Sequence, residues 1–189
     1  RSVSRGLGDV YKRQAMGNVA FYYQGRVIEN IRISNTVDAY AVNGWESMKL
    51  ENHSGIVDNY RYPKGDVEVM ARYNQPLFLA VKMNRKVLNV GDTTIVDTYI
   101  VNEKNLKGNY SLQLIAKDAE GTVLATHVSS VHVKGGNVYG QCLQTGWNFV
   151  PRVTGYVCIE AKLVKDKKTF ATGDDSLFAA VSYTHLRAH

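Results

Sequence analysis

The sequence predicts a mainly β protein in which an immunoglobulin-like β-sandwich follows a short α/β segment. Three observations support this prediction. Six stretches after residue 76 have the length and composition of strands, turn-forming residues separate them, and two of them alternate between apolar and polar side chains. The 189 residues are 44% hydrophobic and 21% charged, which is typical of globular proteins and excludes a disordered or collagen-like chain.

Both ends of the chain differ in composition from the rest of it. Residues 1–14 read RSVSRGLGDVYKRQ and residues 182–189 read SYTHLRAH, and neither string shows apolar periodicity. Both resemble translated sequencing-adapter read-through, so we expect each to be an artefact joined to an internal piece of a longer protein. The alternative interpretation is a basic, flexible native tail at each end.

Most of the positive charge lies in those two ends. The whole chain has 23 Lys and Arg against 17 Asp and Glu, a net charge of +6. The ends hold five of the basic residues and one acidic residue, which leaves 18 against 16, a net charge of +2. A nearly neutral body without a basic, aromatic-rich face predicts no nucleic-acid partner. No run of 18 apolar residues is present, so we also expect no membrane-spanning segment.

Residues 15–75 have mixed character. The spacing of Val27, Ile28 and Ile31 predicts a helix over 24–34. The apolar run 39–42 then reads as a buried strand, and a long polar loop follows it up to residue 75. Helix, buried strand and loop are the order of one α/β unit, which cannot fold alone.

From Pro76 onward the chain has the pattern of a β-sandwich, and we place the domain boundary next to Gln75, with the sandwich over 76–181. Residues 157, 159, 161 and 163 are apolar whereas residues 158, 160 and 162 are polar, as in a strand with one buried face. Tyr110, Leu112, Leu114 and Ala116 repeat this alternation. The expected strands are 77–83, 93–101, 110–116, 123–133, 156–164 and 169–181.

The cysteines and histidines give no sign of a disulfide, a metal site or a cofactor. Cys158 lies on the polar face of its expected strand, so a bridge to Cys142 through the core is disfavoured. His127 and His132 are an odd number of residues apart, which places them on opposite faces of one strand and disfavours a shared metal ion. Because no phosphate-binding loop or zinc-protease motif is present, we expect no cofactor.

The loop after the expected strand 39–42 is the candidate binding site. It offers Trp45 as a stacking face, and Glu46, Asn52 and His53 as polar partners for sugar hydroxyls. Catalytic and binding groups of (β/α)8 barrels lie on loops that follow strands, which favours this position. The alternative is an ordinary polar loop between domains, with Trp45 as packing at its edge.

Three segments of residues 15–181 together resemble glycoside hydrolase family 2, the β-galactosidase and β-glucuronidase group. Ala15-Met16-Gly17-Asn18 matches the AMGN that ends the family's nucleophile motif, EYAHAMGN. Val42-Asn43-Gly44-Trp45 falls where the last barrel strand delivers its glycine and tryptophan. Residues 55–64, GIVDNYRYPK, look like the stretch that leaves the barrel. The resemblance implies the last α/β unit of a truncated (β/α)8 barrel over 15–75, followed by the family's β domain.

The same resemblance implies that this chain lacks the catalytic pair. It places the nucleophilic glutamate at the position that Tyr11 occupies, and the acid/base glutamate farther upstream. A retaining glycosidase needs both carboxyl groups, so we expect no catalytic residue and no hydrolysis here. Glu46 and Glu51 are not that pair. The parent enzyme would act on a β-linked oligosaccharide or glycoside, and we expect it to be periplasmic or secreted in a bacterium.

Two other functions remain open from the residues. The sandwich could be a non-catalytic carbohydrate-binding or adhesion module, with 15–75 as a linker. It could also be a spacer packed against its own barrel. In that case Phe21, Tyr22, Tyr23 and Tyr40 would form an exposed apolar patch.

Overall fold

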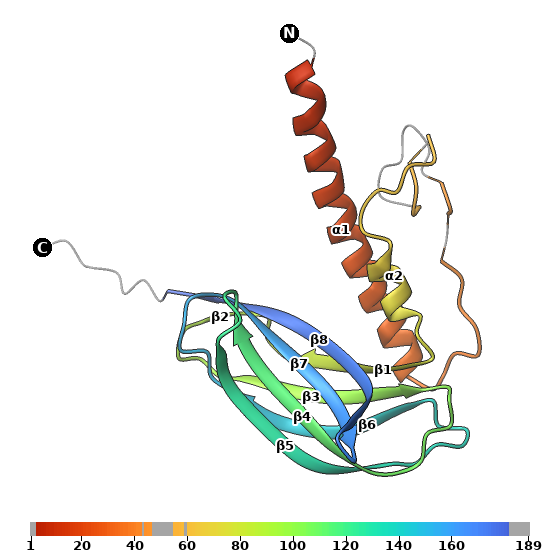
Figure 1. Cartoon of the computed structure of the whole chain (residues 1–189), viewed down its shortest axis with the longest axis vertical. Coiled ribbons are helices and arrows are strands. Elements are labelled where there is room, and N and C mark those ends of the chain that lie inside the picture. The colour runs from red at the N-terminus through yellow and green to blue at the C-terminus, as the bar shows by residue number, and fades with distance from the viewer. Residues whose placement is uncertain (1–2, 43, 47–54, 59, 182–189) are drawn as a thin grey trace, which may run out of the picture. The chain divides into compact units, whose positions relative to one another are not determined.

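The computed structural model describes residues 3–42, 44–46, 55–58 and 60–181, with side chains from residue 15 onward. The chain divides into two compact units, Arg1–Gln75 and Pro76–His189 (Figure 1). We call them the N-terminal unit and the sandwich. The first is helical, and the second holds all the named strands.

The N-terminal unit is built on one long helix, α1, which spans Val3–Ile33. The sequence predicted only residues 24–34 as helix, so the helix begins about six turns earlier than expected. The added segment contains no proline, and extending a helix that tertiary packing already stabilises costs little per residue.

A second, short helix packs against α1. It is α2, Glu68–Tyr73, and it lies within the stretch that was expected to be loop. Phe21 and Ile28 of α1 and Met70 and Tyr73 of α2 form a small buried cluster. Gly25 allows this approach, because a Cβ atom there would overlap the ring of Tyr73.

Two buried arginines of α1 form hydrogen bonds within the N-terminal unit. The guanidinium of Arg32 donates to the carbonyl oxygens of Tyr73 (2.6 Å) and Gln75 (2.7 Å), which fixes the end of α2 to the end of α1. Arg26 donates to both carboxylate oxygens of Glu29 at 2.8 Å. Because both partners are buried, removing either would leave a charge without its counter-ion away from water.

The predicted strand over 39–42 is wrong. These residues have no regular secondary structure, and no described segment pairs with them. A strand exists through hydrogen bonds to a neighbour, so an apolar run without a partner strand has no ladder to join. Tyr40 instead uses its hydroxyl to donate to the side-chain oxygen of Asn74 at 2.6 Å.

The sandwich consists of two antiparallel sheets, to which one short parallel strand is added (Figure 1). The smaller sheet has the order β1-β3-β6 and the larger has the order β2-β8-β7-β4-β5. The strands are β1 Leu77–Met83, β2 Val87–Asn89, β3 Thr94–Asn102, β4 Gly108–Asp118, β5 Val123–Val133, β6 Gly140–Phe149, β7 Gly155–Lys165 and β8 Lys168–Ala180. The predicted mainly β fold is therefore confirmed.

The alternation in the sequence sets the core. Val157, Ile159, Ala161 and Leu163 of β7 are all at most 1% exposed, and the last three pair with apolar residues of β4 across the ladder. The sequence missed β2, which has only three residues. It also missed β6, where Gly146 adopts a left-handed conformation (φ 77°) beside a shift in register with β3. This irregularity interrupts the two-residue period on which strand prediction depends.

Gly173 of β8 lies where the two sheets approach closely. A Cβ atom at this position would overlap the carbonyl oxygen of Leu79 in β1, so a residue with a side chain does not fit without movement of the backbone. A buried carboxylate, Asp175, lies two residues farther along β8 and forms an ion pair with Lys86 at 2.5 Å. Both thiols, Cys142 and Cys158, are free, and they belong to different sheets.

Candidate functional site

The described part of the candidate loop folds back on itself as a narrow hairpin. Val57 pairs with Pro63 in an antiparallel bridge, and the amide of Asp58 donates to the carbonyl oxygen of Tyr62 at 2.9 Å. The carboxylate of Asp58 accepts hydrogen bonds from the amides of Tyr60 (2.8 Å) and Tyr62 (3.0 Å). Such side-chain acceptance of turn amides is the reason that aspartate favours turns. Arg61, at the tip, has a positive φ of 66°.

Trp45 and Glu46 join the base of this hairpin through the backbone. The carbonyl oxygen of Trp45 accepts from the amides of Ile56 (2.9 Å) and Val57 (3.1 Å), and Glu46 forms a parallel bridge with Val57. The carboxylate of Glu46 lies 3.7 Å from the guanidinium of Arg61. Both groups are exposed, so this ion pair contributes little stability and leaves both charges available to a ligand.

Three aromatic side chains of this loop are open to solvent. Trp45 is 66% exposed, Tyr60 is 72% exposed and Tyr62 is 69% exposed. Large aromatic groups are usually covered in a folded protein, and open ones supply rigid apolar faces with a polar edge, as binding surfaces do. We call Trp45, Tyr60 and Tyr62 the aromatic loop. Trp45 was expected from the sequence, whereas the two tyrosines were missed because their exposure depends on the hairpin turn at Asp58.

The other predicted residues are placed less fully. Asn52 and His53 lie outside the described residues. Tyr11, where the family resemblance would place a nucleophilic glutamate, lies within α1. In the part of the chain that the structure describes, no group of three or more His, Cys, Asp or Glu side chains could hold a metal ion. No helix there is both long and apolar enough to span a membrane.

Two of the segments that carry the sequence resemblance meet in the N-terminal unit. Gly17 of α1 packs directly on the backbone of Lys64, where a Cβ atom would overlap the carbonyl oxygen. The side-chain oxygen of Asn18 accepts a hydrogen bond from the amide of Asp66 at 2.7 Å. Burial lowers the pKa of the Lys64 amine below its ordinary value, and the carboxylate of Asp58 opposes this effect. The AMGN segment therefore positions the end of the candidate loop.

The expected aromatic patch of Phe21, Tyr22, Tyr23 and Tyr40 is partly wrong, and Tyr22 is only partly exposed. Phe21 is fully buried and belongs to the cluster with α2, whereas Tyr23 is 64% exposed and Tyr40 is 38% exposed. Tyr23 belongs to a different surface. It forms a stripe with Met16, Val19 and Val27, which are all more than half exposed and recur at helical spacing.

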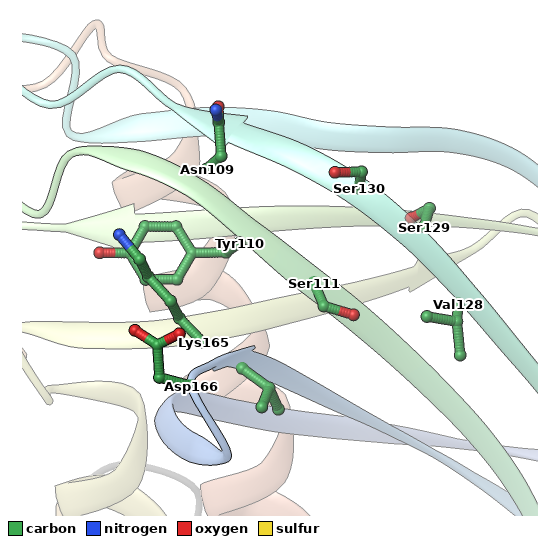
Figure 2. Close-up of a pocket in the computed structure, with 9 residues that line it drawn as sticks. Asn109, Tyr110, Ser111, Val128, Ser129, Ser130, Lys165 and Asp166 are labelled. Atoms are coloured by element: carbon green, nitrogen blue, oxygen red, sulfur yellow. The ribbon is translucent and has the colours of Figure 1, made fainter.

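A broad hollow of about 450 Å³ lies on the face of the sandwich formed by β4, β5 and β7 (Figure 2). Serine hydroxyls line part of it, from Ser111 and Ser130. Tyr110 is almost buried, with the ammonium of Lys165 5.5 Å from its ring centre. Because that ring is covered, the hollow offers hydroxyl and charged groups but no open aromatic face for a sugar.

An open aromatic pair lies elsewhere on the sandwich. Tyr156 of β7 and Phe178 of β8 are cross-strand partners, with ring centres 5.1 Å apart in an edge-to-face arrangement. Tyr156 is 66% exposed. This pair is the sandwich's counterpart to the aromatic loop.

Comparison with known proteins gives structural similarities only. No protein-family model and no curated protein matches the chain. A glycosyl hydrolase family 2 member from Bacteroides cellulosilyticus DSM 14838 matches at 15% identity with a TM-score of 0.42, over 55% of this chain and 15% of that chain. A β-glucuronidase from Bacteroides uniformis matches at 15% identity with a TM-score of 0.39, over 55% and 13%. The CARDB domain of the PF1109 protein from Pyrococcus furiosus matches at 15% identity with a TM-score of 0.37, over 55% and 87%.

The matched region thus spans only about 15% of the length of that glycosyl hydrolase. With identities near 15% and TM-scores below 0.5, these similarities do not assign a family or an activity. The mainly β architecture rests on the strand pairing of the chain itself.

Proposed function

We propose that this chain corresponds to the end of the catalytic barrel and the following β domain of a family 2 β-glycoside hydrolase. In this proposal the aromatic loop contributes sugar-binding surface, and the chain alone does not hydrolyse its ligand. The contact of Gly17 and Asn18 with residues 64–66 is the observation that carries it. Two segments that resemble the family at separate places in the sequence support each other in space.

The exposed apolar stripe on α1 is a second support. One face of this helix packs on α2 through Phe21 and Ile28, and the opposite face carries the stripe of Met16, Val19, Tyr23 and Val27. A helix that is apolar on two faces is typical of a helix placed between two layers. Barrel segments beyond this chain would cover the stripe in the parent enzyme.

Two carboxylates of the loop have other partners. Asp58 accepts two main-chain hydrogen bonds of its own turn, and Glu46 faces Arg61. Retaining hydrolysis requires a pair of carboxyl groups about 5–5.5 Å apart that face the same sugar, one as nucleophile and one as acid and base. We therefore expect no release of 4-nitrophenol from 4-nitrophenyl β-galactoside or β-glucuronide above a buffer blank. Turnover by the purified chain would contradict the proposal.

Sugar binding can be measured through the tryptophan of the loop. The chain has two tryptophans, so Trp147→Phe leaves Trp45 as the sole indole. In this background we expect a β-linked galacto-oligosaccharide to change the Trp45 emission. Tyr62→Ala should weaken the apparent affinity about two- to tenfold, the range of one aromatic contact. Tyr156→Ala, an equally exposed tyrosine of the sandwich, is the matched control and should have no effect.

The second candidate is a glycan-binding sandwich, and the exposed Tyr156–Phe178 pair favours it. This function predicts the opposite pattern, in which Tyr156→Ala abolishes binding and Tyr62→Ala does not. If neither the galacto-oligosaccharide nor a β-glucuronide binds at all, both functions are contradicted.

A further inference from the structure

Strand β5 is an unusually open edge of the larger sheet. The order β2-β8-β7-β4-β5 leaves one side of β5 without a neighbouring strand in its own sheet. The strand has 11 residues, VLATHVSSVHV, without a charged residue or a proline. Its register with β4 is regular from Ala125 to Val133. A long, flat and uncharged edge is a template for pairing with another strand.

The sandwich limits pairing at its other edges. β2 has only three residues, which is too short for a stable ladder. β6 is interrupted by the shift in register beside Gly146. β1 carries a charged side chain, Lys82. Short length, bulges and edge lysines are the usual protections of such strands. β5 is long and has no lysine, and its one shift in register, between Val123 and Ala125, lies at its start.

One side chain of the smaller sheet shows which groups of β5 face outward. The side-chain NH₂ group of Gln141 donates to the carbonyl oxygen of His132 (2.7 Å). The side-chain oxygen of Gln141 accepts from the main-chain amide of Lys134 (2.9 Å). These main-chain groups therefore point away from β4. Because main-chain groups alternate sides every residue in a regular ladder, those of Ser130, Val128 and Thr126 point the same way. Gln141 covers one end of the edge. Farther along, Gln144 of β6 contacts the side chains of His127 and Ser129, while no strand of the larger sheet lies beside the outward main-chain groups.

We propose that the middle part of β5 pairs antiparallel with β5 of a second copy of this chain and joins the two larger sheets across a two-fold axis. The strand is self-complementary for this arrangement. No charged side chain is brought against its own copy, and small hydroxyl residues face one another near the axis. With the axis at Val128, the two Val128 side chains lie directly opposite each other and Thr126 faces Ser130. Val128 is 58% exposed, so its burial adds apolar contact.

The test uses the full chain and sedimentation velocity over a range of protein concentrations. We expect the wild type to show a monomer–dimer equilibrium. Val128→Lys places two ammonium groups near the axis and should weaken the dimer about tenfold or more, since like charges on directly paired strands repel. Ser176→Lys is the control, because Ser176 is an exposed residue of β8 in the same sheet and away from β5.

A second variant separates loss of pairing from loss of folding. Val128→Pro removes an amide that β5 does not use toward β4, and proline is accepted on edge strands for this reason. It should keep the circular dichroism spectrum of the sandwich and abolish the dimer. The inference is overturned by a wild type that stays monomeric at all concentrations. It is also overturned by a dimer that persists in both Val128 variants, or one that only Tyr23→Lys, on the apolar stripe of α1, removes.

Discussion

The two units of the chain differ most in how their interiors are built. The sandwich holds a cluster of nineteen buried apolar residues drawn from both sheets. The cluster in the N-terminal unit has four, and much of its remaining support is polar, from Arg32, Asn18 and the Arg26–Glu29 pair. Apolar burial is the main stabilising term in folding, so among the residues that the structure describes the sandwich has much the larger core.

The difference also explains where the chain exposes apolar surface. On α1, the stripe around Tyr23 lies opposite the face that packs on α2, as expected for an element that needs further neighbours. In the sandwich, Val87, Phe178 and Tyr156 form a short row of open apolar side chains across β2, β8 and β7. The described residues of the N-terminal unit therefore expose a continuous apolar stripe beside a small core, whereas those of the sandwich bury a large one.

The largest expected effect is a cavity in the sandwich core. Leu114 of β4 is fully buried, so Leu114→Ala should lower the free energy of unfolding of the sandwich by about 2–5 kcal/mol. Urea denaturation followed by Trp147 fluorescence in a Trp45→Phe background measures this free energy. The circular dichroism of the helices at 222 nm should keep its own transition midpoint. Gln113→Ala, the outward-facing neighbour on β4, is the control, and a shared shift of both signals would contradict the independence of the units.

A smaller effect is expected at the contact between α1 and the candidate loop. In Gly17→Ala the new methyl group overlaps the backbone of Lys64, and such overpacking costs about 1–3 kcal/mol. The helical transition should move to lower urea, while the Trp147 transition stays in place. Val19→Ala, on the exposed side of the same helix, provides the comparison. If both variants behave alike, the packing of Gly17 on the loop is not what holds the N-terminal unit together.

The two units also differ in how much of them could be predicted from the sequence. In the sandwich, local alternation and burial agree, so β1 and β5 were predicted at their observed bounds and β7 to within one residue at each end. In the N-terminal unit the apolar run 39–42 was predicted as a strand, because a sequence cannot show whether a partner strand exists. Its helix α2 was missed, since six residues carry too little periodicity to recognise.

The candidate site shows the same limit. Trp45 was identified because an aromatic residue after an apolar run is visible in the sequence. Tyr60 and Tyr62 were not, because they are exposed only through the turn that the Asp58 carboxylate stabilises. The contact of Gly17 with Lys64 joins residues 47 positions apart, and no local pattern predicts such a pairing.

The smallest expected effect concerns a local charge on the sandwich and leaves its packing unchanged. Cys142 of β6 is the partner of Tyr99 on β3, and Asp97 lies nearby. Although the residue is exposed overall, desolvation of its sulfur raises the pKa of the Cys142 thiol, and the negative charge of Asp97 raises it further. Hydrogen bonds with Tyr99 and with the backbone of Gln144 oppose this shift.

Asp97→Asn removes the negative charge but keeps the oxygen that accepts from the amide of Gly146 at 2.8 Å. The pKa of Cys142 should then fall, and the reactive thiolate fraction should rise at any pH below that pKa. We expect iodoacetamide to alkylate Cys142 a few times faster at neutral pH in a Cys158→Ser background, with an unchanged urea midpoint. Glu103→Gln, which removes a carboxylate just beyond the end of β3, should leave the rate unchanged. An equal increase in both variants would mean that overall charge, and not Asp97, sets the reactivity of this thiol.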